Sequence, residues 1–183
     1  MIQETKGNEK LRRRLAAIVF ADVVNYSRMM GEDEVATSIT IRERMQVFDE
    51  LAKVHSGEIK SMEGDGIFML FDSAVDAVTF AVQAKKRMDE LNEAADETRR
   101  MDFRFGINLG DILFVNERLS GDSINIAARI EAFADPGKIC ISGSVYDSVS
   151  NKMSIGYEYL GAQKFKNIKD DIDVFLVHEN PTS

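Results

Sequence analysis

The sequence contains a single cysteine, Cys140, among its 183 residues, so the chain cannot form an internal disulfide. Cys140 lies in the apolar run 138–141, and we interpret it as a small buried residue whose free thiol suits a reducing compartment. No uninterrupted apolar stretch approaches the roughly 20 residues of a membrane-spanning helix, and the polar N-terminus lacks the apolar core of a signal peptide. We therefore expect a cytoplasmic protein, or a cytoplasmic domain of a larger one, with no membrane segment in this chain.

Basic residues are also in the minority. Lysine and arginine number 23 against 31 aspartates and glutamates, which gives a formal net charge of −8. Such a chain is not built to bind nucleic acid through a broad basic surface, and it can bind a nucleotide only through local positive charge or a metal. The two histidines, His55 and His178, are too far apart in the sequence to give the spacing of a metal site. The length suits one domain with a sizeable core.

The pattern of apolar residues predicts strands and helices in mixed order. Leu15 to Phe20 is a short apolar run with β-branched members, which is typical of a buried strand. Ser73 is a predicted N-cap for a helix, and acidic residues at 32–34 favour the start of another. The predicted strands are 15–20, 58–62, 67–71, 103–107, 112–115, 138–141, 157–160 and 174–177, and the predicted helices are 32–55, 74–88, 122–134 and 142–149. This order indicates an α+β fold with a largely antiparallel sheet.

Two aspartates follow predicted strands. Asp22 comes at the end of the first strand, and Asp65 lies between two glycines in a predicted hairpin turn. Two carboxylates held close together repel one another unless a cation lies between them, and Mg²⁺ is usually bound by one or two carboxylates together with substrate phosphates. Backbone amides in the loop after Asp22 are candidates for binding phosphate oxygens. From these features alone, ordinary turn or helix-cap aspartates are an open alternative.

Asn125 and Arg129 are four residues apart on a predicted helix, so they share one face. Arginine presents a planar, always-charged fork that suits phosphate, and asparagine can hold a ribose or position a transferring group. The alternative is a purely structural pair, with Arg129 bound to a neighbouring acid such as Glu131 or Asp122. The helix pattern alone leaves both interpretations open.

Taken together, these segments resemble the catalytic domain of class III nucleotidyl cyclases, the adenylate and guanylate cyclase family. They occur in the family's order and spacing and cover about residues 14–178. The matching stretches are 19–27 (VFADVVNYS), 64–66 (GDG), 106–111 (GINLGD), 121–131 (GDSINIAARIE), 136–143 (PGKICISG) and 166–168 (KNI). The resemblance divides the chain into a flexible N-terminal arm or linker end (1–14), which leaves room for an upstream regulatory domain, a cyclase catalytic domain (15–178) and a short tail (179–183).

The resemblance implies a ferredoxin-like sheet with helices packed on it, working as a homodimer whose two composite active sites lie at the subunit interface. It implies that Asp22, Val23 and Asp65 bind two Mg²⁺ or Mn²⁺ ions. Asn125 and Arg129 are then the catalytic pair supplied by the other subunit, and Lys166 falls in the segment that usually contacts phosphate. The remaining positions implied in substrate binding are Phe20, Val23, Val24, Asn25, Tyr26, Ser27, Ser61 and Arg118.

The positions that select the base depart from the family pattern. Adenine-selective members typically carry lysine four residues before the second metal aspartate, where this chain has Ser61. Lys60 is one residue away, and in a regular strand it points to the opposite face. The partner position, usually aspartate or threonine, is Arg118. Adenylate cyclase, the commonest activity among similar bacterial members, is the favoured prediction. A pyrimidine nucleotide cyclase and a catalytically silent cyclase-like dimerisation module are the alternatives.

Overall fold

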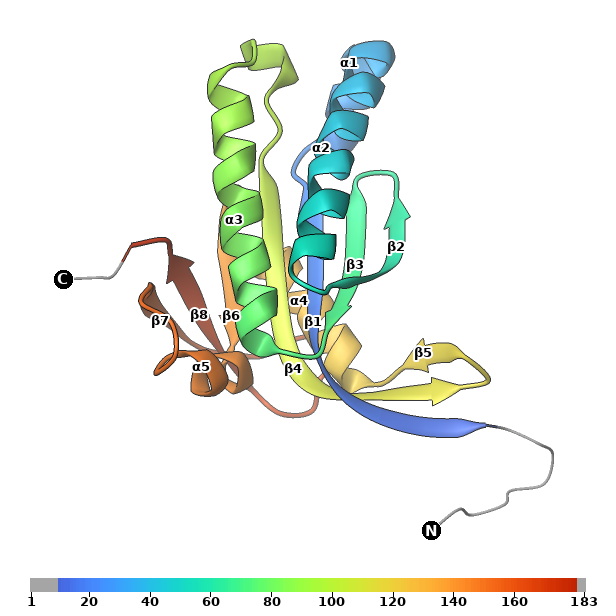
Figure 1. Cartoon of the computed structure of the whole chain (residues 1–183), viewed down its shortest axis with the longest axis vertical. Coiled ribbons are helices and arrows are strands. Elements are labelled where there is room, and N and C mark those ends of the chain that lie inside the picture. The colour runs from blue at the N-terminus through green and yellow to red at the C-terminus, as the bar shows by residue number, and fades with distance from the viewer. Residues whose placement is uncertain (1–9, 181–183) are drawn as a thin grey trace.

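The computed structural model describes residues 10–180. Strands and helices are interspersed along the whole of this range (Figure 1). In chain order they are β1 (Leu11–Val23), α1 (Tyr26–Glu32), α2 (Glu34–Val54), β2 (Glu58–Glu63), β3 (Gly66–Phe71), α3 (Ala74–Glu93), the short 3₁₀ helix η1 (Glu97–Arg99), β4 (Phe103–Val115), β5 (Arg118–Ser120), α4 (Asp122–Phe133), β6 (Ile139–Ser142), α5 (Gly143–Val149), β7 (Gly156–Gln163) and β8 (Ile172–His178).

The strands form one eight-stranded sheet in the order β2-β3-β1-β4-β6-β8-β7, with β5 paired to β4. Every pairing is antiparallel except β4 with β6, which is parallel. The predicted α+β class and the largely antiparallel sheet are therefore confirmed. The two longest strands, β1 and β4, pair over their full lengths in the middle of the sheet, and residues 16–19 of β1 are fully buried there.

Helices cover both faces of the sheet. Helices α2, α3 and α5 lie on one face and α4 on the other (Figure 1). Because successive strand residues point to opposite faces, Ala17 and Val19 of β1 pack under α2 and α3, while Ile18 packs with Ala127 of α4. We call the sheet face that carries α4 the α4 face. Even-numbered residues of β1, Asp22 included, point to it.

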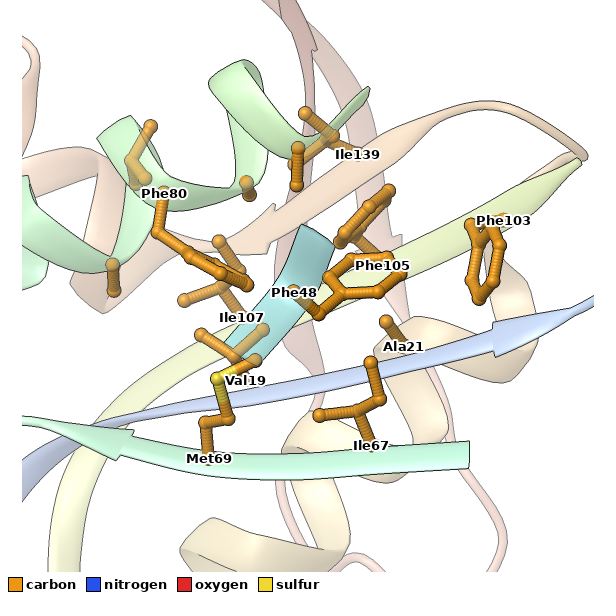
Figure 2. Packing of buried hydrophobic residues seen from close by; sticks show 14 of the residues in the cluster. Val19, Ala21, Phe48, Ile67, Met69, Phe80, Phe103, Phe105, Ile107 and Ile139 are labelled. Carbon is orange, nitrogen blue, oxygen red and sulfur yellow. The ribbon is translucent and has the colours of Figure 1, made fainter. Parts of the chain in front are cut away.

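Aromatic side chains fill the larger core, under α2 and α3. Phe48 of α2 lies over the sheet, with its ring centroid 4.9 Å from that of Phe103 and 6.0 Å from that of Phe105 (Figure 2). Phe80 of α3 packs 6.1 Å from Phe48. Phe48, Phe80 and Phe105 are fully buried, and each such side chain stabilises the fold by about 1.5–3 kcal/mol. This packing fixes β4 and, through it, the residues that β4 presents on the α4 face.

The helix starts follow the predicted chemistry. The Ser73 hydroxyl accepts a hydrogen bond from the Asp76 amide, so the predicted N-cap of α3 is confirmed. Asp33 caps α2 in the same way by accepting from the amide of Ala36. Asp33 itself is extended and separates α2, which corresponds to the helix predicted over 32–55, from α1, which was not predicted. Among the described residues, no helix is both long enough and apolar enough to span a bilayer.

Several elements differ from the sequence prediction. Residues 103–107 and 112–115, predicted as two strands, form the single strand β4, and β5 was not predicted. Strand β1 begins at Leu11, because residues 11–14 pair with 112–115 of β4 in a ribbon that extends beyond the helices (Figure 1). The prediction of a flexible arm is therefore wrong for residues 11–14. Residues 1–9 and 181–183, which hold the rest of the arm and most of the tail, lie outside the described residues. Helix α3 continues to Glu93, five residues past its predicted end, supported by an ion pair between Lys85 and Asp89 one turn apart.

Candidate active site

Asp22 lies at the end of β1 directly opposite Arg104 of β4, in the same antiparallel register. The Arg104 side chain donates from Nε to Asp22 Oδ1 over 2.8 Å and from Nη2 to Oδ2 over 3.2 Å. One guanidinium therefore engages both oxygens of the carboxylate. Both side chains are only partly buried, so Asp22 remains accessible from the α4 face.

Asp65 lies in the turn between β2 and β3, after Gly64, whose φ of 59° is the left-handed conformation that glycine tolerates best. Burial raises the pKa of Asp65 above its ordinary value, and the nearby negative charge of Asp22 contributes to the rise. Backbone amides of Asp65 and Val23 act in the opposite direction. The two aspartates, 43 positions apart in the sequence, are thus close enough to influence each other, as their positions at strand ends predicted.

A third carboxyl group reaches the same place from α4. Glu131 Oε1 lies 2.6 Å from Arg104 Nε, although no donor among the described residues reaches this oxygen in hydrogen-bond geometry. Burial raises the pKa of Glu131 to about 8, and the hydrogen bond and charge of Asp22 add to the rise while Arg104 opposes it. Asp22 and Glu131 therefore share one guanidinium, and burial favours the protonated form of Glu131.

Helix α4 reaches Arg104 because β4 has a glycine beneath it. A Cβ added at Gly106 would lie 2.2 Å from the backbone nitrogen of Glu131 and 2.6 Å from the carbonyl oxygen of Ala127. Only a residue without a side chain permits this approach. Nearby, buried Asn108 donates to the carbonyl oxygen of Ser123 over 3.0 Å and so fixes the first turn of α4.

Asn125 and Arg129 lie on the exposed surface of α4. The two acids considered as structural partners of Arg129 do not pair with it, since Glu131 contacts Arg104 and no ion pair joins Asp122 to any described residue. No hydrogen bond or ion pair within residues 10–180 joins Asn125 or Arg129 to Asp22 or Asp65. One chain therefore brings the two aspartates together and leaves the asparagine–arginine pair facing outward.

The loop after Asp22 is partly occupied by the chain itself. The Val24 amide donates to the carbonyl oxygen of Asp102 over 3.0 Å, so it is not free to bind a phosphate. Asn25, with a φ of 63°, turns the chain into α1, which begins at Tyr26 and carries Ser27 on its exposed side. Of the predicted phosphate loop, the backbone amides of 25–27 remain as candidate donors.

Phe20 lies two residues before Asp22 on the same face of β1. Its ring stacks on that of Phe68, with centroids 4.7 Å apart and an interplanar angle of 2°. The pair forms a flat apolar surface on the α4 face beside the carboxylates. Lys166, the predicted phosphate contact, lies in the loop between β7 and β8 and is exposed.

The predicted orientation of Lys60 is wrong. The register between β2 and β3 shifts between Ile59 and Ser61, so Lys60 is the extra residue of a β-bulge. Ser61 pairs with Phe68 and shares its face, the α4 face. Lys60 reaches the same face, where it forms an ion pair with Glu58 and lines a groove of about 530 Å³ together with Phe114 and other residues of the β1–β4 ribbon. The bulge thus places Lys60 on the same sheet face as Ser61.

Arg118 begins β5, where it is exposed. It pairs with Val115, whereas the neighbouring Leu119 pairs with Phe114, so Arg118 points to the opposite side of the ribbon from Phe114. It lines a separate cavity of about 500 Å³ with Asn116 and Ser120. Within one chain, Arg118 and Lys60 therefore do not face a common pocket.

The donor set fits a magnesium or manganese ion. Asp22 and Asp65 offer hard carboxylate oxygens, the ligands that these ions prefer. No group of three or more His, Cys, Asp or Glu side chains in residues 10–180 is placed to hold a metal unaided. This is the arrangement expected where one or two carboxylates bind the ion jointly with substrate phosphates.

Sequence reasoning did not identify Arg104 or Glu131 as parts of the site. Arg104 alternates with Phe103 and Phe105, which is the signature of an ordinary strand residue facing solvent. Its partner Asp22 is 82 positions away. The usable signal was Gly106, because a glycine inside a strand often marks a close approach by another backbone. That approach is what brings Glu131 beside Arg104.

The chain is similar to known proteins along nearly its whole length. Residues 10–179 match the family described as the adenylate and guanylate cyclase catalytic domain. The chain is 39% identical over 170 residues to the putative adenylate cyclase 3 of Rhizobium meliloti (strain 1021), a match that covers 92% of this chain and 29% of that relative. The chain thus spans less than a third of the length of this relative.

Solved structures show the same fold. The crystal structure of an adenylate/guanylate cyclase/hydrolase from Silicibacter pomeroyi superposes with a TM-score of 0.82 at 34% identity, covering 92% of this chain and 99% of that one. The adenylyl cyclase CyaB from P. aeruginosa superposes with a TM-score of 0.83 at 21% identity, covering 92% and 95% of the two chains.

Proposed function

The chain belongs to the adenylate and guanylate cyclase catalytic domain family, and from this premise we propose that it converts a nucleoside triphosphate into a 3′,5′-cyclic nucleotide and pyrophosphate. In this reaction the ribose 3′-oxygen attacks the α-phosphorus, the bond from that phosphorus to the bridging oxygen breaks, and the 3′-hydroxyl proton is released. The observation that carries the proposal is the proximity of Asp22 and Asp65: Ala21 pairs with Ile67, which brings the strand end at Asp22 beside the turn that holds Asp65.

Asp22 and Asp65 are the residues that would hold two Mg²⁺ or Mn²⁺ ions, with the backbone of Val23 beside them. Bound ions of this kind lower the pKa of the attacking hydroxyl and neutralise the pyrophosphate leaving group. The backbone amides of 25–27 are left to orient the phosphates, and the Phe20–Phe68 stack offers an apolar surface to the nucleoside. The residues of one chain thus provide the metal-binding half of a site.

The residues that would stabilise the transition state have to come from a second chain. Asn125 and Arg129 are exposed on α4 and have no contact with the aspartates of their own chain. We propose a symmetric homodimer in which these residues reach the aspartates of the second copy, which gives two equivalent composite sites. There Asn125 orients the ribose, and Arg129, with Lys166, meets the negative charge that develops on the phosphates.

ATP is the proposed substrate. Its support is the name of the Rhizobium relative, a putative adenylate cyclase, and the bulge that brings Lys60 to the α4 face, which also carries Asp22. A lysine donor suits the ring nitrogens of adenine. A pyrimidine triphosphate is the second candidate, favoured by Arg118, whose charge has no ion-pair partner within residues 10–180 and suits a carbonyl oxygen of the base.

The test is an assay of the purified chain with ATP, GTP, CTP and UTP, each in Mg²⁺ and in Mn²⁺, with the cyclic product detected. We expect cyclic AMP to be the main product and Asp65→Ala to abolish it. Asp72→Ala is the matched control, because Asp72 lies at the other end of β3 and is exposed. Equal product from the wild type and Asp65→Ala would refute the proposal. Product from no triphosphate would favour a catalytically silent module.

A further inference from the structure

Arg104 gives Asp22 a counter-ion that is built into the chain. Two of its nitrogens bind the two carboxylate oxygens, at 2.8 and 3.2 Å, which is the bidentate geometry of the strongest arginine–carboxylate pairs. A third nitrogen, Nη1, donates to the carbonyl oxygen of Ala132 over 3.1 Å. The end of α4 therefore holds the guanidinium in place over Asp22.

Asp65 has no such partner. No ion pair joins Asp65 to a lysine, arginine or histidine within residues 10–180. The two carboxylates of the candidate site are therefore unequal, since Asp22 has a guanidinium partner, which it shares with Glu131, and Asp65 has none among the described residues. This inequality concerns the same atoms that would bind a cation.

A guanidinium and a divalent cation cannot both be close partners of one carboxylate without cost. The two positive charges repel each other, and at a partly buried site this repulsion is screened less than in water. The oxygens that Arg104 engages are also the ones a metal ion requires. Binding of a metal at Asp22 therefore has to displace the guanidinium or overcome its charge.

We infer that Arg104 is a resident counter-ion of Asp22, which competes with a divalent cation for this carboxylate and keeps the affinity of the nucleotide-free chain for that cation low. The inference rests on the proposed function in one respect, because it takes Asp22 as a metal-binding residue. A purely positioning role for Arg104 makes the opposite prediction, since an aspartate released from its support would bind the metal more weakly.

Binding of Mn²⁺ to the nucleotide-free protein separates the two roles. Free Mn²⁺ is measured from its electron paramagnetic resonance signal, without any turnover. We expect Arg104→Gln to bind Mn²⁺ about tenfold more tightly than the wild type, the ratio that corresponds to about 1.4 kcal/mol. Arg14→Gln is the matched control. Arg14 also lies on the central strands, is about as exposed as Arg104, and bridges the two acids Glu58 and Asp72, so its loss should leave Mn²⁺ binding unchanged.

Two outcomes overturn the inference, and they differ in what they say of the proposed function. If Arg104→Gln binds Mn²⁺ no more tightly than the wild type while Asp22→Asn weakens binding, Asp22 is a metal ligand and Arg104 is not its competitor. If Asp22→Asn leaves the binding of Mn²⁺ unchanged in both backgrounds, Asp22 does not hold the metal, and the metal role in the proposed function fails as well.

A measurement on the wild type covers the case in which Arg104→Gln does not fold. The arginine Nε–H resonances are recorded in ¹⁵N-labelled protein, and that of Arg104 is assigned with Arg104→Lys. We expect this proton to be protected from solvent exchange without metal and to exchange at least about tenfold faster when Mg²⁺ is added, because the bond to Asp22 is lost. A resonance unchanged in position and exchange at saturating Mg²⁺ contradicts the competition.

Discussion

Glu131 and Arg104 meet where helix α4 rests on strand β4, with Glu131 Oε1 2.6 Å from Arg104 Nε and Glu131 only 8% exposed. Glu131 also shares its surroundings with Asp22, whose hydrogen bond and charge favour the protonated form of Glu131. The site therefore places one guanidinium between two carboxyl groups, and burial favours the neutral form of Glu131. The chain balances these charges across residues from three separate elements.

This arrangement makes stability depend on pH. The pKa of Glu131 rises from 4.5 to about 8 on folding, so between these values the folded chain keeps a proton that the unfolded chain releases. The contribution is fully present below pH 4.5 and is lost as the pH rises through 8. Relative to Glu131→Gln, which cannot titrate, we expect the free energy of unfolding of the wild type to fall with pH by at most about 1.4 kcal/mol per unit. Urea unfolding followed by circular dichroism between pH 5 and 9 measures this. Parallel curves for the two proteins would contradict it.

Helix α4 packs so closely on β4 that position 106 requires glycine. A methyl group at this position meets the backbone of Glu131 and Ala127 rather than a flexible side chain, so the helix has to move away from β4. We expect Gly106→Ala to reduce the free energy of unfolding by about 3 kcal/mol. Gly31→Ala is the control, because a Cβ on Gly31 in α1 has nothing within 4 Å, and alanine there should stabilise by about 0.5–1 kcal/mol. Equal stability of the two variants in urea would mean that α4 does not pack against Gly106.

The sequence predicted the fold better than it predicted the site. Alternating and helical periodicities follow from burial of one face, so they revealed most strands and helices, and the Ser73 cap is a local signal. The extension of β1 to Leu11 was missed because three consecutive arginines, 12–14, interrupt the apolar pattern of the strand. Their strand is held by pairing with β4, about 100 positions along the chain.

The site depends on such distant pairings even more strongly. Asp22 and Asp65 stand in local motifs and could be proposed as a pair. Arg104 looks like any exposed strand residue until β4 is placed beside β1. The bulge at Lys60 has no local signature either, because a register shift is a property of two strands and not of one. Periodicity in a single segment cannot reveal either feature.

The bulge leads to a prediction about base selection. If Lys60 contacts adenine, Lys60→Ala removes a charged hydrogen bond worth about 1.5–3 kcal/mol, which lowers kcat/KM for ATP by about tenfold to a hundredfold and narrows the preference over CTP. Ser61→Ala is the matched control from the neighbouring position on the same face, and we expect it to change kcat/KM for ATP less than about threefold. Steady-state kinetics with ATP and CTP measure both. A larger loss of kcat/KM for ATP in Ser61→Ala than in Lys60→Ala would mean that Ser61, and not Lys60, contacts the base.

The homodimer is tested by mixing two inactive variants. Asp65→Ala lacks a metal-binding carboxylate, and Arg129→Ala lacks the outward-facing arginine. If sites are composite, a mixed dimer combines Asp65 of one chain with Arg129 of the other in one of its two sites. Random exchange at equal concentrations makes half of all dimers mixed, so about a quarter of the wild-type activity should return.

Two controls show whether the recovered activity comes from composite sites. Each variant alone has no intact site in any dimer and should remain inactive at the same total concentration. A chain carrying both substitutions, mixed with the wild type, should give about a quarter of full activity from wild-type dimers alone, because every mixed dimer then has one site without Asp65 and one without Arg129. If the mixture of Asp65→Ala and Arg129→Ala stays inactive although cross-linking detects mixed dimers, both residues act in a site within one chain. The exposed positions of Asn125 and Arg129 on α4, without a contact to Asp22 or Asp65 in the described chain, are the reason to expect recovery instead.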